Sequence, residues 1–179
     1  MIDAPERYEE WVGNAGNAPA GHVPVFDIVS ASRSDAPVLL TGDAGQAETL
    51  ARQIHGLSGW RHGAFIVLDC GLPEAEVVAA LGRLLFFDDV PAGQPEARLR
   101  QNGTLLLRNV DKLSHVAQNV IGDWLESSRF DRKRRTGRRL MASTSESLLP
   151  AVLAGHFDAE VYYRLNVLHL VLPHDTRPM

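Results

Sequence analysis

The amino-acid sequence predicts an α/β fold in which a five-stranded parallel sheet lies between two layers of helices. Short apolar runs alternate with segments whose apolar residues recur at helical spacing. Strands and helices that alternate in this way form parallel sheets covered on both faces. The composition agrees, because 45% hydrophobic and 22% charged residues in a chain of 179 suit one globular domain with a sizeable core.

The elements follow from the pattern in chain order. Residues 1–21 are rich in Ala, Gly, Asn and Pro after a short polar start, which predicts a helical turn within a flexible leader. Residues 22–179 form the predicted α/β domain. Within it we expect a helix at 23–32, a strand at 38–41, a helix to about residue 57, a strand at 64–69, a helix at 74–87, a strand at 103–107, a helix at 114–127 capped by Ser114, a strand at 140–144, two short helices at 146–154 and 158–165, and a strand at 167–172.

Composition also limits the compartment and the kind of site. No apolar run approaches the roughly 18–20 residues that a membrane span needs, and the N-terminus lacks a signal-peptide pattern. The single cysteine, Cys70, excludes an internal disulfide framework. The seven histidines show no paired metal-ligand spacing. We therefore expect a cytoplasmic protein with no membrane contact and no metal ion.

A basic segment interrupts an otherwise acidic chain. Residues 129–139 hold seven basic residues and one acid, a local charge of +6 in a chain of net charge −4. Thr136-Gly137 predicts a hairpin turn between two short extended arms. Such a cluster could bind nucleic-acid phosphates, but a solvated hairpin or a docking patch for an acidic protein is the favoured interpretation. The residues concerned are Arg129, Arg132, Lys133, Arg134, Arg135, Arg138 and Arg139.

The turn after the first predicted strand has the frame of a phosphate-binding loop. A buried strand, a glycine-bearing turn and a helix follow one another here, so backbone amides and a helix N-terminus could cradle phosphate oxygens. Such a loop reads G-x-x-x-x-G-K-[ST]. In this chain the second glycine is Ala47 and the lysine is Glu48, whose carboxylate would repel phosphate. The loop residues are Gly42, Asp43, Ala44, Gly45, Gln46, Ala47, Glu48 and Thr49.

Several further blocks, in the same order, resemble one family. They are Pro37 to Gly45 (PVLLTGDAG), Ala51 to His55 (ARQIH), Phe65 to Cys70 (FIVLDC), Asn102 to Leu107 (NGTLLL), Ala142 to Ser145 (ASTS), and Gly155 to Phe157 with Tyr162 to Val167 (GHF, YYRLNV). The chain thus resembles, over about residues 21–173, the AAA+ ATPase domain of the NtrC-type activators of sigma-54. The resemblance implies a three-layer P-loop NTPase fold, here without the helical lid that follows in the family.

The chain departs from this family at the positions that carry its chemistry. The resemblance aligns the Walker A lysine with Glu48, the Walker B acidic pair with Arg108 and Asn109, and the sensor asparagine with Ser145. Of two arginines that reach a neighbouring subunit's nucleotide, the first aligns with Asp158 and the second with Arg164. The GAFTGA loop that touches sigma-54 has no counterpart before Gly103.

These departures predict a protein without ATPase activity. Phosphoryl transfer needs phosphate cradling, a held Mg²⁺ and positioned water, and the charge that each requires is lost or reversed. The leading hypothesis is a non-catalytic pseudo-ATPase that regulates bacterial transcription by association with a protein, such as an AAA+ activator subunit. The alternatives are a nucleic-acid-binding module using residues 129–139, and a sensor that binds ATP or ADP without hydrolysis. Nucleotide binding is disfavoured but left open, as is assembly into a homo-oligomer.

Overall fold

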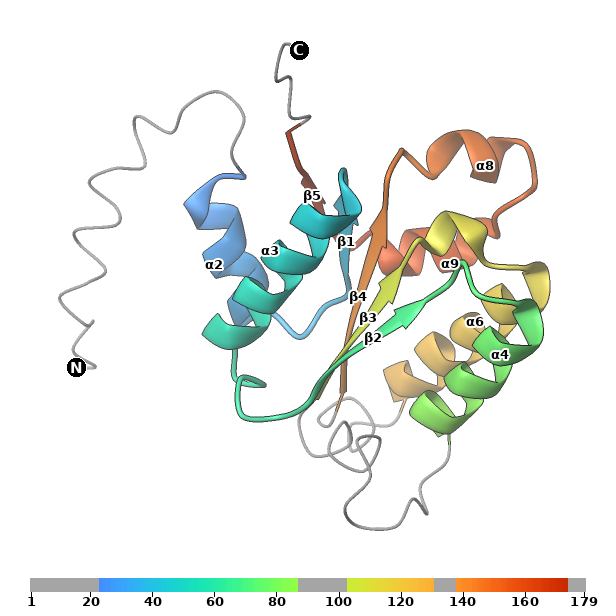
Figure 1. The fold of residues 1–179 in the computed structure, drawn as a ribbon, viewed down its shortest axis with the longest axis horizontal. Coiled ribbons are helices and arrows are strands. Elements are labelled where there is room, and N and C mark those ends of the chain that lie inside the picture. Colours follow the sequence, from blue (N-terminus) through green and yellow to red (C-terminus); the bar gives the residue numbers. More distant parts are fainter. Residues whose placement is uncertain (1–22, 87–102, 131–137, 174–179) are drawn as a thin grey trace, which may run out of the picture.

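A computed structural model describes residues 23–86, 103–130 and 138–173 of the chain. Its centre is a sheet of five parallel strands in the order β2-β3-β4-β1-β5 (Figure 1). The strands are β1 (Val38–Thr41), β2 (Phe65–Asp69), β3 (Gly103–Arg108), β4 (Arg138–Thr144) and β5 (Leu168–Val171). The predicted five-stranded parallel sheet is confirmed. The expected leader at 1–21 and the turn at Thr136-Gly137 lie outside the described residues.

Helices cover both faces of the sheet. Figure 1 shows α2 and α3 on one face and α4, α6 and α9 on the other. The helical elements are α2 (Val25–Arg33), α3 (Ala44–Leu57), α4 (Glu74–Leu81), the π-helical turn η2 (Gly82–Phe86), the 3-10 turn η3 (Val110–Lys112), α6 (His115–Phe130), α8 (Leu149–Leu153) and α9 (Ala159–Leu165). The predicted three-layer arrangement is therefore confirmed.

Strand β1 explains why the strands are continuous apolar runs in the sequence. Val38 and Leu40 pack into the core beneath α2 and α3, while Leu39 packs into the core on the opposite face. Successive side chains of a strand point to opposite faces. Because helices cover both faces, apolar side chains are favoured on both faces of the strand.

The basic segment differs from the predicted hairpin. Helix α6 continues to Phe130, so Arg129 has helical backbone, and strand β4 begins at Arg138. The prediction of an extended arm on each side of the turn is therefore wrong for Arg129, which lies in α6. Strand pairing explains the early start of β4, since Arg138 and Arg139 continue the parallel register opposite Gly103 and Thr104.

Smaller differences concern the ends of helices. The helix predicted at 74–87 is α-helical only to Leu81 and continues as a π-helical turn. The amide of Ala117 donates to the hydroxyl of Ser114 at 3.3 Å, which confirms the predicted cap of α6. Within the described residues, no helix is long and apolar enough to cross a membrane.

His55 is a buried polar residue between α3 and the sheet. It is 8% exposed, and its Nδ1 lies 2.8 Å from the hydroxyl oxygen of Thr104 on β3. Burial lowers the pKa of His55, and the positive charge of Arg139 lowers it further, with a smaller contribution from Arg52. A backbone hydrogen bond at Gly63 opposes the shift without reversing it.

We expect the stability of the fold to decrease as the pH falls below the ordinary histidine pKa of 6.5. The unfolded chain takes up a proton there while folded His55 stays neutral, so stability is full above this pH and is lost as the pH falls towards the lower folded pKa. His169, whose pKa burial also lowers, adds to the same trend. Urea unfolding across this range tests the prediction. His55→Gln should make the free energy of unfolding depend less on pH, and the exposed control His62→Gln should not. The same pH dependence in both variants would contradict the prediction.

Candidate nucleotide site at the carboxyl edge of the sheet

Gly42 makes the turn between β1 and α3. Its φ is +146°, a region that side-chain-bearing residues rarely adopt, and its amide donates to the carbonyl of Thr144 at 2.9 Å. A Cβ added at this position would come within 2.7 Å of the Cβ of Leu172. The turn therefore requires glycine for both conformation and space.

Asp43 occupies the helix N-terminus that a phosphate would need. It is the N-cap of α3, and its Oδ1 accepts hydrogen bonds from the amides of Gly45 at 3.1 Å and Gln46 at 3.0 Å. Helix α3 begins at the next residue, Ala44, and the hydroxyl of Thr49 donates back to the carbonyl of Gly45 at 2.8 Å. The amides expected to cradle an anion thus already have a carboxylate partner.

Glu48 points into an ion pair rather than an open site. Its Oε1 accepts from Arg52 Nη2 at 2.7 Å, one turn along α3, and its Oε2 lies 3.5 Å from Arg108 Nη1. The side chains of Glu48 and Arg108 are 25% and 35% exposed. The resemblance aligns Glu48 with the Walker A lysine and Arg108 with the first Walker B acid. Each therefore carries the opposite charge to its family counterpart, and the two side chains lie side by side.

Asp69 completes this cluster from the end of β2. Its Oδ2 accepts from Arg108 Nη2 at 2.7 Å, while its Oδ1 accepts from Asn109 at 2.9 Å and from the amide of Gly71 at 2.9 Å. The hydrogen bond from Arg108 is the main reason that the pKa of Asp69 is lowered, and Asp69 in turn raises the pKa of Arg108. Asn109 adopts a left-handed conformation with φ +59°. Arg108 thus holds two carboxylates, those of Glu48 and Asp69.

We predict that Arg108→Gln destabilises the fold by about 1 kcal/mol, a figure kept small because the groups are partly exposed. The substitution removes the cation that Glu48 and Asp69 share. The loss should shrink in high salt and as the pH falls, since the stabilisation of Asp69 is present above its ordinary pKa of 3.8 and disappears on protonation. Urea unfolding measures it, with the exposed Arg83→Gln as control. A loss that does not vary with salt or pH would contradict the ion-pair explanation.

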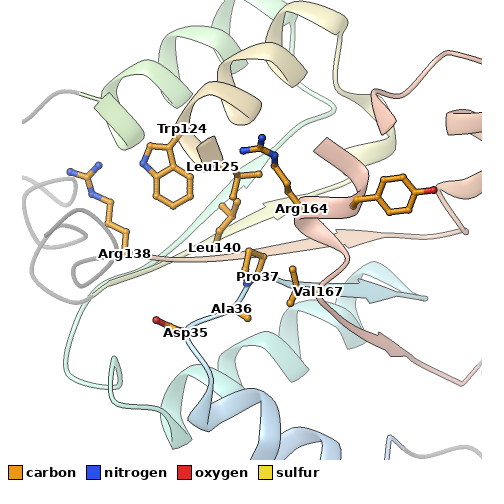
Figure 2. A pocket seen from close by; sticks show the side chains of 10 residues that line it. Asp35, Ala36, Pro37, Trp124, Leu125, Arg138, Leu140, Arg164 and Val167 are labelled. Carbon is orange, nitrogen blue, oxygen red and sulfur yellow. The ribbon is translucent and has the colours of Figure 1, made fainter. Parts of the chain in front are cut away.

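The other aligned positions have structural partners of their own. Ser145 is exposed directly after β4. Asp158 is the N-cap of α9: its carboxylate accepts from the amide of Val161 at 2.9 Å, and its own amide donates to Gln118 at 2.7 Å. Arg164 lies on α9 beside the residues that precede β1 and begin β4 (Figure 2). Glu48 lies on α3, which follows the other end of β1.

The described part of the basic segment is not an open cationic surface. Arg138 is partly buried and donates to the carbonyl of Leu85. Arg139 is 0% exposed, and its Nη2 donates to the carbonyl of Ala31. The assignment of Arg139 as a nucleic-acid contact is therefore corrected, because its side chain reaches no solvent. Arg132, Lys133, Arg134 and Arg135 lie outside the described residues, as does the side chain of Arg129.

Magnesium–ATP does not fit these residues. A phosphate at the turn would displace the carboxylate of Asp43 and meet that of Glu48. At the metal position, the guanidinium of Arg108 would repel a cation. Over residues 23–86, 103–130 and 138–173 there is no group of three or more His, Cys, Asp or Glu side chains that could hold a metal. Cys70 is 2% exposed, and burial raises the pKa of its thiol to about 12.

The parallel strand order and the β1–α3 turn at the carboxyl edge of the sheet define the P-loop NTPase fold. The family model for the sigma-54 interaction domain matches residues 16–171. The chain therefore belongs to the sigma-54 interaction domain family, which takes part in transcription regulation.

Curated relatives agree over most of this chain. It is 32% identical over 178 residues to the regulatory protein AtoC of Escherichia coli, covering 92% of this chain and 38% of AtoC. It is 35% identical over 168 residues to the probable regulatory protein HrpS of Pseudomonas syringae, covering 86% of this chain and 55% of HrpS. It is 31% identical to a Nif-specific regulatory protein of Bradyrhizobium diazoefficiens, covering 90% of this chain and 29% of that protein. The chain thus spans between about a quarter and a little over half of the relatives' lengths.

Solved structures support the same fold. NtrX from Brucella abortus in complex with ATP has a TM-score of 0.65 at 19% identity, covering 97% of this chain and 36% of NtrX. The P-loop NTPase domain of a sigma-54 activator from E. coli has a TM-score of 0.60 at 20% identity, covering 98% of this chain and all of that domain. At these identities the likeness concerns the fold alone.

Proposed function

We propose that this chain is a non-catalytic member of its family, a pseudo-ATPase that acts in bacterial transcription regulation by associating with another protein. The observation that carries the proposal is the ion-paired cluster of Glu48, Arg108 and Asp69 at the carboxyl edge of the sheet. It places a carboxylate where phosphate charge would need a cation, and a cation where Mg²⁺ would need carboxylates.

Asp43 supports the same proposal by a separate contact. A helix N-terminus binds anions through its free amides. Here the Asp43 carboxylate accepts from both Gly45 and Gln46, so an incoming phosphate would have to replace an existing charged acceptor. The positive charge of the Walker A lysine is missing, and the amides of Gly45 and Gln46 already bind the Asp43 carboxylate. Both differences oppose nucleotide binding.

The proposal of protein association rests on the fold, which is kept although the residues for nucleotide chemistry are replaced. The described sheet and helices keep the fold of the family, and we propose that the chain uses this fold to contact a neighbouring subunit. The partner we propose is a subunit of an active sigma-54 activator or another regulatory protein of the same bacterium. The chain would join or imitate a subunit of the partner's ring, or act as a separate adaptor in the cytoplasm.

The test combines turnover, binding and association on the purified chain. We expect no Mg²⁺-dependent release of phosphate from ATP, and no rise in the melting temperature at millimolar ATP or ADP, because a ligand held by the native state must raise stability. Co-purification from native cells should recover a regulatory protein. Mg²⁺-dependent hydrolysis that disappears on changing Glu48 or Arg108 would refute the proposal.

A further inference from the structure

A second site lies far from the nucleotide position, between helices α6 and α9 and the amino ends of β1 and β4. It is a cavity of about 440 Å³. Figure 2 shows Trp124, Leu125 and Arg164 along one side, Asp35, Ala36, Pro37 and Val167 across from them, and Leu140 between. The volume is in the range of small-molecule sites, which are mostly apolar with a few convergent polar groups.

The walls of the cavity are apolar and firmly held. Trp124, Leu125 and Leu140 are 5%, 6% and 2% exposed, and all three belong to the core on that face of the sheet. Val167, at 55% exposed, lies on the opposite side. The cavity therefore offers a flat apolar group apolar side chains on both sides, Trp124 on one and Val167 on the other.

Arg164 contributes a guanidinium group, of which one nitrogen has no hydrogen-bond partner among the described residues. Its side chain is 15% exposed, and its Nη2 donates to Glu160, whose side chain is 72% exposed. Within the described residues its Nη1 is buried and has no hydrogen-bond partner. A buried guanidinium N–H without an acceptor is costly. Because Nη1 has almost no accessible surface, the Arg164 side chain must turn toward the cavity before an acceptor brought by a ligand can reach it and remove that cost.

The charges around the cavity orient the ligand. Arg138 and Asp35 also line it, and both have interactions of their own. Asp35 lies across the cavity from Arg164 (Figure 2), so an anionic group would be repelled at one end and attracted at the other. Guanidinium prefers carboxylate, with which it forms short charge-assisted hydrogen bonds.

We infer that this cavity binds a small aromatic carboxylate, with the ring between Trp124 and Val167 and the carboxylate on Arg164. The site is independent of the nucleotide position and of the proposed association with a protein. It gives Arg164 a role within its own chain, because the side chain lines the cavity, is only 15% exposed and is paired with Glu160.

The test uses 2-naphthoate as the probe and 2-naphthalenemethanol as a neutral analogue with the same ring. We expect calorimetry on the full chain to give saturable binding of 2-naphthoate with a Kd of about 0.1–1 mM. The alcohol should bind at least about tenfold more weakly, since it lacks the charge that Arg164 recognises. Equal affinities, or no saturable binding of the acid, would overturn the inference.

Two variants separate the charge from the cavity. Arg164→Gln should weaken 2-naphthoate about tenfold while changing the alcohol little. Ala36→Phe fills the cavity and leaves Arg164 in place, so it should weaken both probes and remains decisive if Arg164→Gln fails to fold. Arg83→Gln, an exposed arginine outside the cavity, is the matched control. Unchanged affinity in Ala36→Phe would overturn the inference.

Discussion

Gly42→Ala should destabilise this protein by about 2–4 kcal/mol, which is large for the addition of one methyl group. The φ of +146° is strained for any residue with a Cβ, and the added methyl would lie 2.7 Å from the Cβ of Leu172. Leu172 directly follows β5, and its amide donates to the carbonyl of Thr41 at 2.7 Å. The methyl can be accommodated only if β5 moves away from β1.

Gly56→Ala is the matched control for Gly42→Ala. Gly56 lies on α3, is exposed, and an added Cβ there meets nothing within 4 Å. Alanine in a helix should stabilise by about 0.5–1 kcal/mol. Thermal unfolding followed by circular dichroism should show the melting temperature fall by roughly 5–15 °C for Gly42→Ala and rise slightly for Gly56→Ala. A loss of less than about 1 kcal/mol at Gly42 would mean that β5 yields easily.

The fold could be predicted from the sequence because its signals are local. Each strand is a short apolar run ended by Gly, Pro or a polar residue, and burial on both faces makes such runs continuous. The strand ends predicted at 38–41 and 103–107 agree with β1 (Val38–Thr41) and, within one residue, with β3 (Gly103–Arg108). The order β2-β3-β4-β1-β5 depends on contacts between distant segments, and it was not predicted from the sequence.

The candidate site was predicted only in part, because its contacts join separate strands. Glu48 and Arg108 stand out in the sequence as reversed charges, but their proximity depends on the sheet bringing α3 beside the end of β3. Asp69 was missed. Its only signal was an acid at the end of a strand, and its role appears when Arg108 and Asn109 reach it from β3.

Arg139 shows how a local charge pattern can mislead. In the sequence it is the last of seven basic residues, which favours an exposed position. In the structure it is the second residue of β4, opposite Thr104, where the sheet buries it completely. Its guanidinium lies 5.5 Å from the ring centroid of Trp60 and donates to Ala31. Burial lowers its pKa to about 10, and the charge of Asp35 offsets only part of that shift.

We expect Arg139→Met to stabilise the fold by about 1–3 kcal/mol. Within the described residues, the Nε and Nη1 of Arg139 are buried without hydrogen-bond partners, so removing them removes a desolvation cost. Methionine has a similar length and can pack in the space left by the stem. The carbonyl of Ala31 would not be orphaned, because it also accepts from the amide of Ser34 at 3.3 Å.

Arg139→Lys separates charge from shape. It keeps a buried cation but loses the guanidinium that lies over the Trp60 ring, so it should destabilise by about 1–2 kcal/mol while methionine stabilises. Urea unfolding of both variants beside the wild type measures the difference. If methionine instead costs more than about 1 kcal/mol, the contacts to Ala31 and Trp60 outweigh the desolvation of the guanidinium, and Arg139 is a net stabilising residue. If methionine stabilises, Arg139 lowers the free energy of unfolding of the wild type. Its contacts with α2 and Trp60 must then be explained by function.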